Sequence, residues 1–104
     1  MPRRTRAGSA VPEDGARLEG GRQQYLHLVR LAWDLRALGV STVVEVGPGR
    51  VPAVRIARAR GPVRVMAWAI DGAMWVFTWG HSRDKRVGVF DASAAARIAR
   101  LADD

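Results

Sequence analysis

The stretch VRVMAWAIDGAMWVFTWG at residues 63–80 decides the fold of this chain. Two apolar runs flank Asp71 and Gly72. An Asp-Gly pair between such runs is a strong hairpin signal, because both central residues of a type I′ turn need a positive φ angle. The pattern therefore predicts two antiparallel strands, at residues 63–70 and 73–79, joined by a two-residue turn.

The register of this hairpin predicts an aromatic sheet face. Pairing outward from a two-residue turn sets Trp68 opposite Trp75 and places Phe77 and Trp79 on the same face. The other face carries smaller residues, among them Ala67. Both faces are apolar, and the pattern leaves open which of them the helices cover.

Residues 22–38 predict the first helix. At about 100° per residue, apolar side chains share one side of this segment, and Leu26 and Trp33 widen the apolar arc. His27 falls on the polar side, and Gly39 follows at the position of a C-terminal helix cap. An arc this wide indicates burial against more than one surface, or a dimer contact.

The remaining elements complete an α+β pattern. Further strands are expected at about residues 42–46, 51–60 and 87–90, and a second helix at about 92–102 after the N-cap candidate Asp91. Short turns between consecutive strands favour an antiparallel meander over a parallel sheet. We therefore expect a two-layer sandwich in which two helices cover a meander of about four or five strands.

Composition sets the organisation of the chain. Residues 1–21 contain few large apolar side chains and predict a disordered tail, whereas residues 22–104 predict a single domain. The chain has no cysteine, which excludes disulfides and thiol nucleophiles. No apolar run is long enough to span a membrane and no signal peptide is recognisable, so a cytoplasmic location is expected.

The layout resembles certain small actinobacterial α/β proteins of unassigned function. The resemblance covers about residues 25–102 and depends on FTWG at residues 77–80 and on Phe90 and Asp91 before the last helix. It implies no activity and assigns no functional residues.

The chain is strongly basic, with a formal net charge of +7, and Lys85 is the only lysine among 17 basic residues. Arginine in place of lysine is typical of a GC-rich genome, so the basic surface has two interpretations: codon bias or attraction to polyanions. No signature of a known nucleic-acid-binding motif is present. The candidate nucleic-acid-binding residues gather at the expected open end of the hairpin: Arg60, Arg64, Trp79, Arg83, Lys85 and Arg86.

Catalysis has weak support in the sequence. The only cluster that resembles a catalytic triad is His81, Ser82 and Asp84, and neighbours on one loop do not converge as a triad does. The same loop offers too few ligands for a metal site. We expect neither enzymatic activity nor a cofactor or metal.

The surplus of apolar surface favours a non-catalytic binding or adaptor module that acts through protein–protein contacts, with an unidentified partner or as a homodimer. Nucleic-acid binding is the alternative. The candidate interface residues are Leu26, Trp33, Trp68, Trp75 and Phe77.

Overall fold

The computed structural model describes residues 10–103, and the side chains of residues 21–103. Helix α1 is followed by five strands, the short helix α2 and two single turns of 3-10 helix. Their bounds are α1 (Ala10–Ala37), β1 (Thr42–Glu45), β2 (Ala53–Ile56), β3 (Val63–Ile70), β4 (Met74–Thr78), η1 (Arg83–Lys85), β5 (Arg86–Gly88), α2 (Ala94–Ala99) and η2 (Arg100–Asp103).

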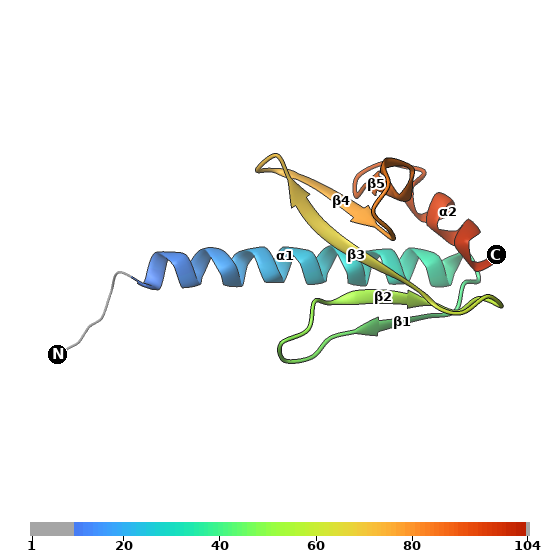
Figure 1. The fold of residues 1–104 in the computed structure, drawn as a ribbon, viewed down its shortest axis with the longest axis horizontal. Coiled ribbons are helices and arrows are strands. Elements are labelled where there is room, and N and C mark those ends of the chain that lie inside the picture. The colour runs from blue at the N-terminus through green and yellow to red at the C-terminus, as the bar shows by residue number, and fades with distance from the viewer. Residues whose placement is uncertain (1–9, 104) are drawn as a thin grey trace.

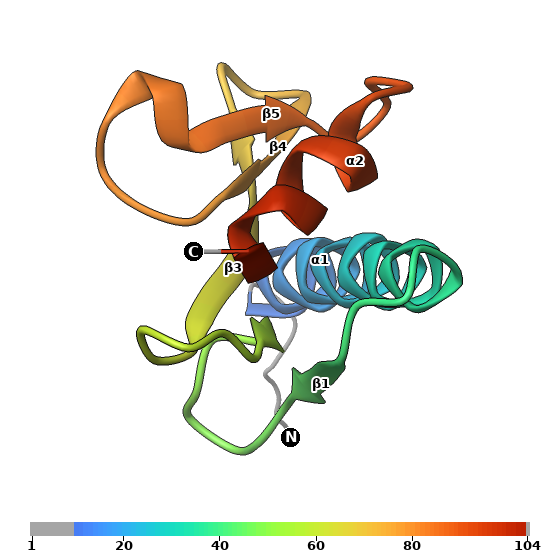
Figure 2. The ribbon, with the colours of Figure 1, turned by 90° about the vertical axis from the view of Figure 1, so that its right-hand side faces the viewer.

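The predicted α+β class is confirmed. Each strand pairs antiparallel with the next, in the order β1-β2-β3-β4-β5, and the two helices cover one face of this meander. Figure 2 looks along α1 and shows the sheet curving around this helix, from β5 above it through β3 beside it to β1 below it, with α2 next to α1. The sheet face turned towards the helices is called the inner face, and the opposite one the outer face.

The core lies between α1, the inner face and α2. The Gln24 side-chain amide also donates a hydrogen bond of 2.8 Å to the carbonyl oxygen of Ala67, which ties α1 to the middle of β3. The core side chains come from α1, the sheet and α2: Leu28, Leu31, Leu35, Val54, Ile56, Val65, Phe77, Val87 and Ile98.

Helix α1 is longer than the sequence pattern indicates. It begins at Ala10 and not near residue 22, so it crosses the boundary expected between a tail of residues 1–21 and a domain of residues 22–104. Adding a residue to an existing helix gains a hydrogen bond without a new nucleation step, and Pro12 in the first turn needs no intrahelical partner. Residues 1–9 lie outside the described residues.

The first half of α1 projects beyond the strands, as Figure 1 shows. The Cα radius of gyration is 16.4 Å and the principal extents are 57 × 26 × 24 Å. A compact chain of this length has a radius of gyration of about 13 Å. The projecting helix accounts for the elongated shape.

The hairpin forms where it was predicted, but its register was predicted wrongly by one residue. Ile70 pairs with Met74, so the turn contains Asp71, Gly72 and Ala73, with φ of +48° at Asp71 and +83° at Gly72. A shift of one residue moves every side chain of the second strand to the other face. The positive φ angles were correctly expected, and the additional turn residue was not.

The shift separates the aromatic side chains. Trp68 pairs with Val76, whereas Trp75 pairs with Ala69 and Phe77 with Ala67. Trp75 and Phe77 therefore lie on the inner face and Trp68 on the outer face, and the predicted single aromatic face does not exist. Opposite each inner ring stands an alanine, which leaves room for the ring beneath the helices.

The other turns follow the sequence signals. Gly39 has a φ of +82°, and the Val40 N–H donates to the Leu35 carbonyl oxygen at 2.9 Å, as expected for a helix cap. Strand β2 is shorter than the predicted 51–60, because the Gly61 N–H donates to the Arg58 carbonyl oxygen at 3.1 Å and closes a turn there.

The second helix also starts later than the expected residue 92. The Asp91 carboxylate accepts hydrogen bonds from the backbone N–H of Ser93 at 2.8 Å and from its hydroxyl at 2.7 Å. These bonds lower the pKa of Asp91 and shape the turn that precedes Ala94. Asp91 thus organises the start of α2 from outside the helix.

Candidate functional site

The five candidate interface residues do not share one surface. Leu26 and Trp33 are exposed on α1, and Trp68 is exposed on the outer face. Trp75 is half-buried against the core and Phe77 is 4% exposed, so Phe77 is not available to a partner. The expected continuous patch is replaced by two separate exposed surfaces.

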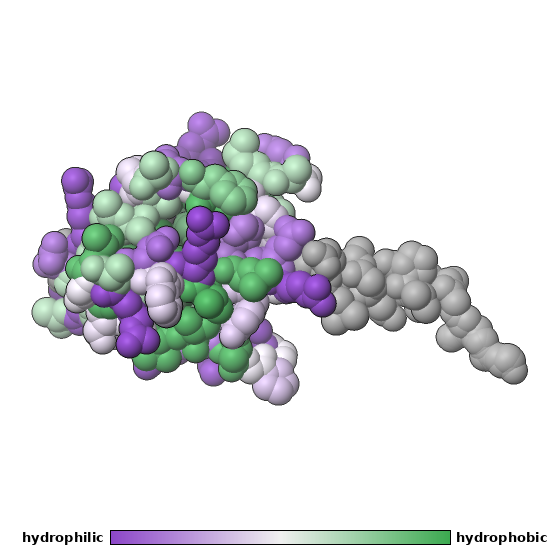
Figure 3. Space-filling view, turned by 180° about the vertical axis from the view of Figure 1, so that it is seen from behind, coloured by the Kyte–Doolittle hydropathy of each residue, from purple (hydrophilic) through white to green (hydrophobic). Residues whose placement is uncertain are grey.

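The first surface is a strip of apolar side chains along α1. Tyr25, Leu26, Val29 and Trp33 are 43%, 55%, 37% and 73% exposed, and we call these four residues the α1 strip. Their spacing of three and four residues places them along one side of the helix, with Leu26 and Trp33 farthest from the buried Leu28. Figure 3 views the molecule from the side on which α1 lies. In this view, apolar side chains gather across the middle and lower part of the molecule.

The second surface is a hollow on the outer face of the β3–β4–β5 sheet. It has a volume of about 590 Å³ and opens to solvent between the three strands and the loop that follows β4. The strands contribute one aromatic, one thioether, one hydroxyl and one guanidinium group, and the loop adds an imidazole, a second hydroxyl and a second guanidinium. The side chains are Met66, Trp68, Thr78, His81, Ser82, Arg83 and Arg86.

Hydrogen bonds hold the loop beside this hollow. The Trp79 N–H donates to the Lys85 carbonyl oxygen at 3.0 Å, and the Lys85 N–H donates to the Ser82 carbonyl oxygen at 3.0 Å. The Lys85 side chain lies directly over Gly80, where a Cβ atom would collide with it. The aliphatic part of Lys85 therefore covers the loop and does not line the hollow.

The outer face is basic, and one carboxylate neutralises part of it. Arg64 Nε donates to Glu45 Oε1 at 2.9 Å, and Arg55 Nε lies 3.8 Å from Glu45 Oε2. These are the two ion pairs among the side chains of residues 21–103. Arg83 and Arg86 at the hollow are exposed and take part in neither.

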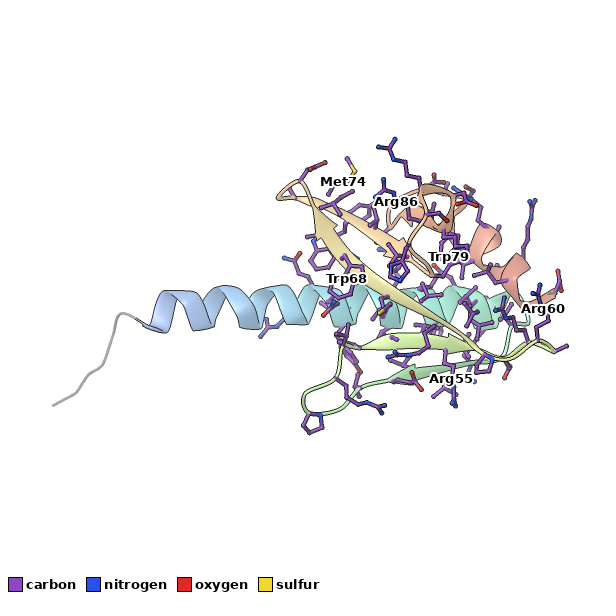
Figure 4. All side chains as sticks on the ribbon, in the orientation of Figure 1. Arg55, Arg60, Trp68, Met74, Trp79 and Arg86 are labelled. Carbon is purple, nitrogen blue, oxygen red and sulfur yellow. The ribbon has the colours of Figure 1, made fainter. Side chains whose placement is uncertain are left out.

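The candidate nucleic-acid-binding residues do not all converge. Arg83 and Arg86 meet at the hollow, while Arg64 is held by Glu45. Arg60 extends from the β2–β3 turn and lies well apart from Arg86 in Figure 4. Trp79 is half-buried against the core, so its ring is not presented to solvent in the way that stacking on a base requires.

The aromatic residue at the hollow is Trp68, which sequence reasoning placed on the same face as Trp75. Met66 and Thr78, which pair across β3 and β4, were also not recognised as neighbours of the basic loop. The signal that identifies them is the register, which depends on whether Ala73 belongs to the turn.

A third region surrounds His27, between α1 and the segment before α2. The imidazole ring lies 5.0 Å from the Trp75 ring and 5.6 Å from the Phe90 ring. His27 was predicted on the polar side of the helix; it is half-buried because Trp75 and Phe90, which come from other elements, contact its ring. Partial burial, with a smaller effect of Arg30, lowers the pKa of His27.

The His27 region does not assemble a catalytic arrangement. A hollow of about 220 Å³ adjoins it, lined also by Arg30, Asp34 and Asp91. Among residues 21–103, the imidazole makes ring contacts and no hydrogen bond to a carboxylate that would orient it as a general base. The lowered pKa favours the neutral form of the His27 imidazole, and its ring contacts Trp75 and Phe90.

The loop cluster of His81, Ser82 and Asp84 is exposed. Interaction with the Ser82 side chain lowers the pKa of the Asp84 carboxyl group. Within the described part of the chain, no group of three or more His, Asp or Glu side chains is placed to hold a metal ion.

Comparisons with known proteins assign no family. No family model, no curated protein and no solved structure matches the chain. The resemblance to small actinobacterial proteins therefore stays a prediction. None of the described helices is both long and apolar enough to cross a membrane.

Proposed function

We propose that this protein is a non-catalytic, cytoplasmic binding module that acts through protein–protein contacts and associates with a second copy of itself through the α1 strip. The observation that carries this proposal is the exposure of four large apolar side chains on one side of a single helix, with Trp33 at 73%. Contiguous apolar patches on a soluble domain mark sites of association.

The energetic argument depends on the size of these side chains. Burying a large apolar side chain contributes about 1.5–3 kcal/mol, so leaving four of them in water forgoes several kcal/mol. The domain buries Leu28, Leu31 and Leu35 from the same helix, so α1 already supplies a complete set of core residues. The α1 strip is additional to the needs of the fold.

A second copy is a suitable occupant because a two-fold axis pairs one patch with itself and removes both strips from water together. Helix α1 is long, and the exposed α1 strip lies on a side of it that the sheet does not cover, so a second helix can lie along it. A stable dimer buries about 800 Å² on each copy.

Sedimentation equilibrium of the purified protein tests this proposal. We expect a dimer at about 100 µM, and a monomer when Leu26→Glu or Trp33→Glu places a charge in the strip. Leu38→Glu is the matched control, because Leu38 is as exposed as Leu26 (55% each) but lies just past the end of α1 and outside the strip. A monomeric wild-type protein, or equal loss of the dimer in the Leu38 variant, would contradict the proposal.

A further inference from the structure

The hollow on the outer face combines three chemical features in one place. Trp68 on β3 is 39% exposed, unlike Trp75 and Trp79, which are half-buried against the core. Arg86 lies across from Thr78, which lies across from Met66, so a guanidinium, a hydroxyl and a thioether form a row across three strands. The volume of about 590 Å³ is within the range of sites that accept a small organic group.

The charged side chains that line the hollow have one sign. Arg83 and Arg86 line it and no carboxylate does. Asp84, next to Arg83 in the chain, is exposed and stays ionised because its pKa is lowered, but its side chain does not line the hollow. An anionic group in the hollow would therefore meet two guanidinium groups that are free to form paired hydrogen bonds with phosphate oxygens.

The basic surface continues from the hollow across the outer face. The register places Arg64 on β3 opposite Arg55 on β2, and Arg55 lines a second hollow together with Arg58. Glu45 is the acid among them, and it pairs with both Arg55 and Arg64. A chain of phosphates lying across the sheet would thus meet arginines at several successive positions.

We propose that the outer face binds single-stranded nucleic acid, with an unpaired base stacked on Trp68 in the hollow and flanking phosphates held by Arg83 and Arg86. Sheet surfaces that combine an exposed aromatic ring with a basic track bind single strands in this way, because every base offers a face for stacking. This proposal does not rest on self-association, since the α1 strip lies on another side of the molecule.

A duplex is a poorer fit than a single strand. Reading the major groove of DNA usually requires an exposed helix or a β-ribbon with long side chains, and α2 and the second half of α1 lie against the inner face. Stacking on Trp68 requires a base that has left its own stack, which costs free energy in a duplex and little in a single strand. The hollow therefore favours a single strand over a duplex.

Fluorescence anisotropy with a fluorescein-labelled oligothymidine of about 12 nucleotides, and with the corresponding oligouridine, tests the proposal. We expect binding with a dissociation constant in the micromolar range, roughly tenfold weaker in Trp68→Ala and close to wild type in Trp68→Phe, which keeps a stacking ring. In the double variant Arg83→Ala/Arg86→Ala, the slope of log K against log salt should fall by about 1.4, since each phosphate contact on a single strand contributes about 0.7.

The matched control is Arg97→Ala/Arg100→Ala, which removes the same charge from α2 and η2, away from the outer face. This variant should keep most of the affinity. The proposal is overturned if the wild-type protein does not bind either strand, if the two double variants lose affinity equally, or if a duplex of the same length binds as well as the single strand. Circular dichroism checks that every variant is folded. If the arginine variants do not fold, the difference in affinity between Trp68→Phe and Trp68→Ala still tests the proposal.

Discussion

Glu45 on β1 holds Arg64 on β3 across the intervening strand β2, with Arg64 Nε and Glu45 Oε1 2.9 Å apart. The same carboxylate reaches Arg55 on β2, so one acid partly neutralises two bases on the outer face. All three side chains are partly open to solvent, and ion pairs of this kind contribute at most about 1 kcal/mol to stability. Glu45 therefore contributes little to folding stability, and its main effect is to reduce the positive charge of the outer face.

Replacing Glu45 should strengthen nucleic-acid binding. In Glu45→Gln both arginines lose their carboxylate, and we expect affinity for oligothymidine to rise about two- to fivefold with a steeper salt dependence. The melting temperature should change little. Anisotropy titrations at several salt concentrations measure this effect, and weaker binding by the variant would contradict the assigned role of the outer face.

The pH dependence of stability should report on His27. Its pKa is lowered in the folded protein, so the unfolded chain binds the proton more readily, and stability falls as the pH drops below the unfolded pKa of about 6.5. We expect the melting temperature to decrease between about pH 7.5 and about pH 5.5, and to decrease less in His27→Phe, which keeps a ring beside Trp75.

His81→Gln is the control for this measurement, because His81 is exposed in the loop after β4. This variant should retain the pH dependence of the wild-type protein. An equal reduction of the pH dependence in both histidine variants would show that His27 is not the responsible group.

The observed register predicts unequal costs for two ring deletions on the same hairpin. Phe77→Ala removes a ring that is 4% exposed and should destabilise the protein by about 3–5 kcal/mol. Trp68→Ala removes a ring from the outer face and should cost about 1 kcal/mol. Chemical denaturation measures both values, and similar losses would place the two rings on one face, as the two-residue turn implied.

Much of the fold follows from local signals in the sequence. Asp71 and Gly72 have the positive φ angles that a hairpin needs, and Gly39 ends α1 where a cap residue was expected. Short connections between strands were enough to predict the meander. These features depend on residues next to each other in the chain, which is why the sequence alone indicates them.

The errors arise where distant parts of the chain decide the outcome. Ala73 joins the turn because that register sets Phe77 against the core, and no local pattern requires it. His27 is covered because Trp75 and Phe90 reach it from other elements. The hollow beside Trp68 depends on the same register, so its composition was not predictable from the hairpin sequence.

Salt should act in opposite directions on the two proposed associations. Each chain carries a net charge of +7, so two copies repel each other, and screening by salt should strengthen the dimer. Binding of an oligonucleotide releases counterions and should weaken with salt. Sedimentation measures the dimer and anisotropy the oligonucleotide complex, each between about 0.05 and about 0.5 M sodium chloride. If salt strengthened both associations or weakened both, the assignment of an apolar strip and a basic face would be contradicted.

Fluorine NMR of the protein labelled with 5-fluorotryptophan tests the central claim, that two exposed tryptophans on different sides of the domain serve two different partners. The four tryptophan resonances are assigned by single Trp→Phe variants. Raising the protein concentration should shift the Trp33 resonance alone, and adding oligothymidine should shift the Trp68 resonance alone. Resonances of Trp33 and Trp68 that respond together, or shifts confined to Trp75 and Trp79, would contradict the account.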